Sequence, residues 1–162
     1  MNKNYISISK NLKFEGRAFI DGKYVNAIDN EKFENINPAT GEILCSVAKC
    51  NHKDVDLAVK VSRKAFNSGV WSRTSPEFRK DILLKFAELL RKTGEENSVL
   101  ESVDTGKLIG DCMNEVANDA PMHFQWYGEL IDKVFGKVGP TEPSLTSLII
   151  KEPIGVVAGV VP

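Results

Sequence analysis

Long hydrophobic runs, paired cysteines and an excess of one charge are all missing from this sequence of 162 residues. No apolar run reaches the roughly 20 residues that a membrane-spanning helix needs, and the N-terminus lacks the apolar centre of a signal peptide. Its three cysteines are an odd number, and their spacing is not that of a disulfide framework, which is typical of free thiols in a reducing cytoplasm. The 21 basic residues balance 22 acidic ones, so no basic footprint for nucleic acid or for a membrane surface is present. We therefore expect a cytoplasmic protein with neither kind of partner.

Glycine-rich phosphate loops are also missing. The sequence contains no G-x-G-x-x-G, and Gly106-Lys107 lacks the glycine five positions earlier that a P-loop requires. Gly155 and Gly159 lie inside an apolar segment, where they are better explained by close packing than by a cofactor loop. The residues alone therefore predict no nucleotide site.

Catalytic and metal constellations are equally scarce. Cys112 and His123 fall on one predicted helical segment, about 16 Å apart along its axis, so they are not expected to form a dyad. Cys45, Cys50 and His52 lack both the C-x2-C spacing and the fourth ligand of a zinc site. The residues by themselves thus identify no nucleophile, acid–base pair or metal cluster.

The clearest pattern that is present lies at the end of the sequence. Residues 154–161 carry no polar side chain, and half of them are valine. Such a run is typical of a strand buried on both faces of a parallel sheet, and Pro153 marks its beginning. A strand of this kind needs strands beside it and helices above and below, so we expect the N-terminal piece of a larger α/β protein.

The preceding chain changes from a period of 2 to a period of 3.6. A hairpin is predicted at 18–25 around Asp21-Gly22, and alternation over 33–48 around a turn at 37–41 predicts a small antiparallel sheet. An N-terminal capping box at 51–54 opens the first of four predicted helices, with Gly94 near the end of the second and Pro121 kinking or restarting the fourth. The four helices are expected at about 51–66, 76–94, 95–104 and 113–134. A linker at 139–143 and a strand at 145–150 follow.

Six short segments, in this order and spacing, resemble the N-terminal part of an aldehyde dehydrogenase. They are FIDGKY at 19–24, INPATGE at 36–42, DVDLAV at 54–59, FNSGVWS at 66–72, DTGK at 104–107, and EPIGV at 152–156 leading into VVP at 160–162. The resemblance covers about residues 17–162. The stretches at 71–80 and 126–136 further resemble the gamma-glutamyl-gamma-aminobutyraldehyde dehydrogenase branch, which serves putrescine degradation.

The resemblance implies an α/β enzyme with a Rossmann-like domain for NAD or NADP, a catalytic domain and an oligomerisation arm. In the family a cysteine attacks the aldehyde, hydride passes to NAD(P)+, and a glutamate base directs the water that releases the acid. These catalytic groups lie beyond the matched segments, and none of Cys45, Cys50 and Cys112 fits the nucleophile's motif. The 162-residue chain by itself is therefore expected to be inactive.

Few functional positions carry over by this resemblance. The strand end whose backbone lies against the cofactor matches Val160, Val161 and Pro162. A structural monovalent cation in some members is bound at the positions of Asn35, Ile36 and Asp104. Asp119 lies near the opening of the family's aldehyde channel. Residues 145–150 match part of the oligomerisation arm, which implies a homodimer or homotetramer.

The implied division has four parts: a loose N-terminal arm or irregular first helix at 1–16, part of the NAD-binding domain at 17–140, an oligomerisation strand segment at 141–153, and the first strand of the Rossmann-like core at 154–162. Two alternatives stay open. The chain is a truncated, non-catalytic interaction or oligomerisation stub, or it is an independent small ligand-binding α/β domain. The missing phosphate loop argues against the second alternative.

Overall fold

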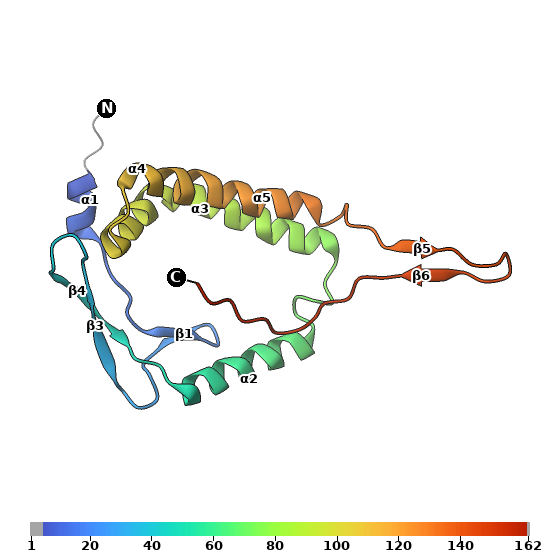
Figure 1. Cartoon of the computed structure of the whole chain (residues 1–162), viewed down its shortest axis with the longest axis horizontal. Helices are drawn as coiled ribbons and strands as arrows, with labels where there is room; N and C mark the ends of the chain where they lie inside the picture. Colours follow the sequence, from blue (N-terminus) through green and yellow to red (C-terminus); the bar gives the residue numbers. More distant parts are fainter. Residues whose placement is uncertain (1–4, 162) are drawn as a thin grey trace.

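The computed structural model describes residues 5–161, which form an open ring with one hairpin projecting from it (Figure 1). In chain order the elements are α1 (Tyr5–Asn11), β1 (Ala18–Ile20), β2 (Lys23–Val25), β3 (Lys32–Ile36), β4 (Ile43–Ala48), α2 (His52–Ser68), α3 (Pro76–Thr105), α4 (Ile109–Cys112), the π-helix η1 (Met113–Asp119), α5 (Ala120–Leu130), β5 (Lys137–Gly139) and β6 (Ser147–Ile149). The predicted α/β class is confirmed. Part of the segment expected to be a loose arm or irregular helix is α1, and residues 1–4 lie outside the described part. None of the helices described is both long and apolar enough to cross a membrane.

The first two hairpins form where the sequence predicted them. Asp21 and Gly22 have φ values of 53° and 73°, as a type I′ turn between β1 and β2 requires. Strands β3 and β4 pair antiparallel, also as predicted. The two hairpins are separate two-stranded sheets instead of one sheet. The connection between them, residues 26–31, is hydrogen-bonded to the start of α2.

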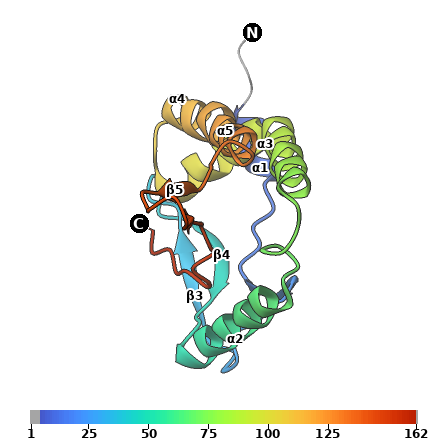
Figure 2. The ribbon, with the colours of Figure 1, turned by 90° about the vertical axis from the view of Figure 1, so that its right-hand side faces the viewer.

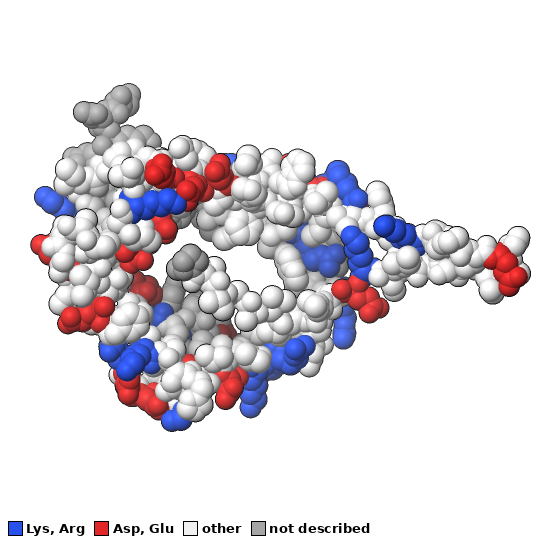
Figure 3. Space-filling model, viewed as in Figure 1, with Lys and Arg blue, Asp and Glu red and all other residues white. Residues whose placement is uncertain are grey.

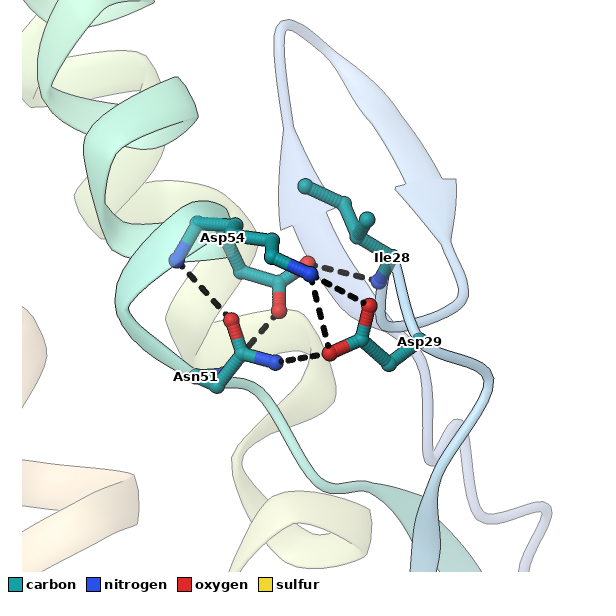
Figure 4. Close-up of polar contacts among 5 residues, drawn as sticks. Ile28, Asp29, Asn51 and Asp54 are labelled. Carbon is teal, nitrogen blue, oxygen red and sulfur yellow. Dashed lines mark hydrogen bonds and ion pairs between the residues drawn. The ribbon is translucent and has the colours of Figure 1, made fainter.

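A polar network fixes that connection (Figure 4). The predicted capping box is present: Asn51 Oδ1 accepts a hydrogen bond from Lys53 N, and Asp54 Oδ2 accepts one from Asn51 N, both at 2.9 Å. The other carboxylate oxygen of Asp54 accepts a 2.9 Å hydrogen bond from the backbone N–H of Ile28. Asp29 in turn receives hydrogen bonds from Asn51 Nδ2 and Lys53 Nζ. Asp54 is only 3% exposed, so this helix cap is also a buried tether between the first hairpin and α2.

Helix α3 runs without interruption through Gly94, where the sequence predicted a stop. A Cβ atom placed on Gly94 would lie 2.9 Å from the Cβ atom of Ala117 on η1, so the glycine permits close helix contact. One turn later the fully buried Ser98 hydroxyl lies 2.7 Å from Gly94 O and 3.1 Å from Cys112 O. The helix ends at Gly106, with φ of 75°, as predicted. The two helices predicted at 76–94 and 95–104 are thus one.

The predicted disturbance at Pro121 takes the form of the π-helix ahead of it. Proline has no backbone N–H to continue the helical ladder. The N–H of Ala120 bonds to Glu115 O, five residues back, which is the wider π spacing. The ordinary helix α5 begins at Ala120, with Pro121 in its first turn, and packs along α3. Figures 1 and 2 show these two helices side by side on one side of the ring, with α2 opposite and β3–β4 between.

The end of the chain departs from the prediction. Strand β6 lies within the predicted strand at 145–150 and pairs with β5, which was not predicted. The predicted buried strand at 154–162 is not formed: residues 151–161 have no regular structure, and Ile154, Val160 and Val161 are 91%, 97% and 83% exposed. A strand of this apolar composition needs strands on both sides, and residues 5–161 place none there.

The buried core is correspondingly small. Among residues 5–161 the buried hydrophobic side chains are those of Ala27, Ala48, Ala87, Val99 and Cys112. The chain exposes 12494 Å², whereas a compact monomer of 17.9 kDa is expected to expose about 8,000 Å². The space-filling view shows the middle of the ring open (Figure 3). Residues 5–161 thus leave apolar surface exposed that a compact monomer would bury.

The segment ahead of β1 offers a pH test. Arg17 donates to both carboxylate oxygens of Glu15, at 2.7 and 2.6 Å, and its backbone N–H adds a third hydrogen bond. These bonds lower the pKa of Glu15 from 4.5 to about 2. Because the folded pKa is the lower one, the stabilisation is present above about pH 4.5 and disappears as the pH falls through 2.

We expect carboxyl-carbon NMR to find the midpoint of Glu15 near pH 2, and Arg17→Ala to return it toward 4.5. A midpoint near 4.5 in the unmodified chain would contradict the pairing.

Candidate functional site

The structure brings together two of the three candidate cation residues. Asn35 lies on β3 and Asp104 in the last turn of α3, and Asn35 Nδ2 donates a 2.5 Å hydrogen bond to Asp104 Oδ1 across 69 positions of sequence. Ile36 follows at a bulge in the β3–β4 register, with its side chain half exposed. The amide and carboxylate oxygens here are of the type that hard cations prefer. The described residues contain no cluster of three or more His, Cys, Asp or Glu that could hold a metal ion.

The close approach of Pro38 to Gly106 keeps this junction together. Gly106 has a left-handed backbone, and a Cβ atom at this position would lie 2.9 Å from Pro38 Cγ. The turn of the β3–β4 hairpin therefore rests directly on the end of α3. The Asn35–Asp104 hydrogen bond lies at the same junction, and no local pattern in the sequence places these two residues together.

Asp119 is the last residue of η1, and its side chain is exposed. Its backbone oxygen lies 2.7 Å from Nδ1 of His123, one turn later in α5. The carboxylate itself forms no ion pair within residues 5–161, unlike Glu115 on the same π-helix, which pairs with Lys107. The sequence did not predict the π-helix. The sequence did contain a sign that another segment packs closely on α3: the small residues Gly94 and Ser98 lie one turn apart on the same face of that helix.

The candidate cofactor-wall residues Val160 and Val161 are almost fully exposed, and Pro162 lies outside the described residues. Their backbone groups are not engaged in a sheet within residues 5–161, so they are free to face another surface. Neither residue contacts Asp119 or the Asn35–Asp104 pair in an interaction that the structure shows. The predicted site residues thus lie in three separate places on the ring.

A cavity of about 480 Å³ separates the end of α2 from residues 153–157. Its lining is mainly apolar and includes Phe66, Trp71 and Val157. Arg79 also lines it, and the Nε atom of Arg79 is buried without a hydrogen-bond partner. No Cys, His, Asp or Glu lines this cavity, so it offers a docking surface without groups for acid–base or nucleophilic chemistry.

The three cysteines differ in burial: Cys112 is buried, Cys45 is partly buried and Cys50 is exposed. Cys112 is buried beneath Ser98, and burial raises the pKa of its thiol. Burial also raises the pKa of Cys50, with the nearby Asp54 carboxylate adding to the effect. A catalytic nucleophile needs the opposite shift. His123 is exposed and its hydrogen bond goes to Asp119, so it forms no dyad with Cys112.

Comparison with known proteins gives one consistent result. The model of the aldehyde dehydrogenase family matches residues 24–162. The chain is 40% identical to the NADP/NAD-dependent aldehyde dehydrogenase PuuC of Escherichia coli, over 93% of this chain and 30% of that protein. It is 39% identical to the aminoacetaldehyde dehydrogenase of Pseudomonas aeruginosa, over 99% of this chain and 32% of that protein.

Solved structures agree. The aldehyde dehydrogenase KauB from Pseudomonas aeruginosa aligns with a TM-score of 0.90 at 40% identity, covering 94% of this chain and 31% of that chain. The gamma-glutamyl-gamma-aminobutyraldehyde dehydrogenase from Burkholderia cenocepacia aligns with a TM-score of 0.86 at 39% identity, covering 90% and 29%. The chain spans about 30% of the length of these relatives, and its fold matches theirs over 94% and 90% of its own length. It belongs to the aldehyde dehydrogenase family.

Proposed function

We propose that this chain is the N-terminal part of an NAD(P)-dependent aldehyde dehydrogenase subunit that oxidises an aldehyde to a carboxylic acid. The observation that carries the proposal is the combined sequence and fold match, with a TM-score of 0.90 at 39–40% identity over 94% of the chain. An indole-3-acetaldehyde dehydrogenase of P. syringae within this set was solved with NAD+. Because about 70% of the relatives' length lies outside the match, the activity is proposed for the complete subunit.

The chain's own residues fit part of a cofactor site. The exposed backbone of Val160 and Val161 can form one wall, but the described residues supply no phosphate loop to complete it. When bound, a nicotinamide cofactor would supply the hydride acceptor. The roles that we propose for this chain are to present the 154–161 segment to that cofactor, to hold a monovalent cation at Asn35, Ile36 and Asp104, and to place Asp119 at the aldehyde entrance.

For the substrate we propose gamma-glutamyl-gamma-aminobutyraldehyde, in putrescine degradation within the cytoplasm. Support comes from the resemblance at 71–80 and 126–136 and from the Burkholderia structure at 39% identity. Aminoacetaldehyde and indole-3-acetaldehyde appear in the names of two relatives with similar sequence identity to this chain, so both aldehydes are included in the same assay.

The test compares the purified 162-residue chain with the native protein from its source, following NADH or NADPH formation with each of the three aldehydes. We expect the native protein to oxidise the gamma-glutamyl compound with the highest kcat/KM and the short chain to give no rate above the buffer. Burial raises the pKa of the Cys50 and Cys112 thiols, whereas the family's nucleophile needs a thiol of lowered pKa, and none of the three cysteines fits the nucleophile's motif. Turnover by the short chain, or no turnover by the native protein, would refute the respective half of the proposal.

A second role, as a non-catalytic stub, is favoured by one observation: the chain exposes about half as much surface again as a compact monomer should. A stub would bind complete subunits through this surface. Mixing labelled short chain with the native oligomer and separating the species by size tests it, since only a stub enters the larger species.

A further inference from the structure

The last described residues, 151–161, are partly buried at one point only. They have no regular structure, and Ile154 and Val160 are 91% and 97% exposed. Gly155 and Val156 are the two residues of this segment that are partly buried. Figure 1 shows the segment passing the end of α2 before it runs into the middle of the ring. The contact at Gly155 and Val156 therefore decides where the rest of the segment lies.

The backbone of Gly155 has a conformation that other residues rarely adopt. Its φ is 119°, in the region that a residue with a Cβ atom seldom occupies. A Cβ atom on Gly155 would lie 2.9 Å from Nη1 of Arg63, and 3.7 Å from both Cζ and Nη2 of the same residue. These three atoms form one guanidinium group on α2. The missing side chain of Gly155 thus lets this group lie directly against the backbone of the segment.

Arg63 is in turn held by an aromatic ring of its own helix. Its Cζ atom lies 5.7 Å from the centroid of the Phe66 ring, a distance at which a guanidinium group is attracted to an aromatic face. Phe66 and Pro153 both line the cavity of about 480 Å³ that also reaches Gly155 and Val157. The end of α2 therefore contacts the segment through the Phe66 ring and the Arg63 guanidinium together.

A small rotation at Gly155 has a large effect further along the chain. Val160 follows five positions later, and an extended chain of that length spans at most about 17 Å. A rotation of about 10° at Gly155 would then displace Val160 by up to about 3 Å. Because a misplacement of about 1 Å can cost an enzyme roughly a hundredfold in rate, this turn is a sensitive point.

We propose that Arg63 is a positioning residue for the cofactor wall, because its contact with Gly155 fixes the direction in which residues 156–161 enter the ring. Arg63 acts through the backbone of Val160 and Val161 and needs no contact of its own with the cofactor. The inference rests on the proposed function, since it specifies how the 154–161 segment is held toward the cofactor.

Backbone NMR of the 162-residue chain tests the contact itself. In the unmodified chain the order parameter of the Val156 amide should be that of a rigid backbone, about 0.85, and in Arg63→Ala it should fall below about 0.6. Lys64→Ala is the matched control, because Lys64 is the next residue of α2, is also exposed and carries the same charge. It should leave the order parameter unchanged. An equal fall in both variants, or no fall in Arg63→Ala, would overturn the proposal.

Cofactor binding by the native protein tests the positioning. Titration with NADH or NADPH, followed by the fluorescence of the nicotinamide, gives the Kd without turnover. Arg63→Ala should raise this Kd about tenfold or more and should change the KM for the aldehyde by less than about twofold, whereas Lys64→Ala should change neither. A general loss of structure would raise both constants together. An unchanged Kd, or a parallel rise of Kd and aldehyde KM, would overturn the proposal.

Gly155→Ala is a second variant that leaves α2 unchanged. Its Cβ atom would have to displace the Arg63 guanidinium, and alanine would strain the backbone at this φ, so the Kd for the cofactor should rise by a similar factor. An unchanged Kd in Gly155→Ala would contradict the role of this turn. A native protein that binds no nicotinamide cofactor would refute the proposed function, whereas cofactor binding that does not respond to Arg63→Ala would refute only the positioning role.

Discussion

Replacing Asp54 with Ala should lower the free energy of unfolding by about 2–5 kcal/mol. The carboxylate is 3% exposed and accepts hydrogen bonds from the backbone N–H groups of Ile28 and Asn51, both at 2.9 Å. Alanine leaves both donors without an acceptor in a place that water barely reaches. The tether between the first hairpin and α2 would be lost with them.

Urea denaturation of the chain, followed by far-UV circular dichroism, measures this loss. Asp56→Ala is the matched control, since Asp56 lies two residues on in the same helix with an exposed side chain, and its effect should stay within about 0.5 kcal/mol. Asp54→Asn keeps the shape and one acceptor oxygen and should fall between them. Equal stability of the Asp54→Ala and Asp56→Ala variants would show that the tether contributes nothing.

The second large effect is expected at Gly94, where replacement by Ala should destabilise the chain by about 1–3 kcal/mol. The new Cβ atom would lie 2.9 Å from Ala117 Cβ and 3.0 Å from its Cα, so α3 and η1 would have to separate. This cost opposes the gain of about 1 kcal/mol that Ala normally brings to a helix interior.

Gly110→Ala is expected to change the stability in the opposite direction. Gly110 lies in α4 with no atom within 4 Å of its Cβ position, so the same substitution should stabilise by about 0.5–1 kcal/mol. Thermal unfolding of both variants compares them directly. A stabilised Gly94→Ala chain would contradict the close contact between α3 and η1.

Sequence patterns correctly predicted the parts of the fold that depend on residues close together in the sequence. The type I′ turn needs Asp21-Gly22, and the cap of α2 needs Asn51 and Asp54, so neighbouring residues suffice for both. Gly94 was misjudged because a glycine in a helical pattern is typical of either a stop or a close contact, and its contact, Ala117, lies on another helix. The 154–161 segment forms no strand among residues 5–161, because an apolar run of this kind pairs only where neighbouring strands exist; its place as the first strand of a Rossmann-like core stays a prediction.

The candidate site depends even more on long-range contacts. Asn35 and Asp104 meet across 69 positions, and only the resemblance to aldehyde dehydrogenases singled them out. The spacing of residues in the sequence predicted neither the hydrogen bond from Ile28 N to Asp54 nor the buried Arg79 Nε atom without a partner. The roles of Asp119 and of Val160 to Pro162 stay predictions, because the surfaces that they would face are not among residues 5–161.

The intact mass of the native polypeptide, taken together with its NAD(P)+-dependent aldehyde oxidation, tests most directly whether this chain is the N-terminal part of an aldehyde dehydrogenase subunit. We predict an active polypeptide much heavier than 17.9 kDa whose N-terminal sequence is that of this chain. A native product of 17.9 kDa would contradict that prediction, and its incorporation into oligomers of complete subunits would then decide for the stub.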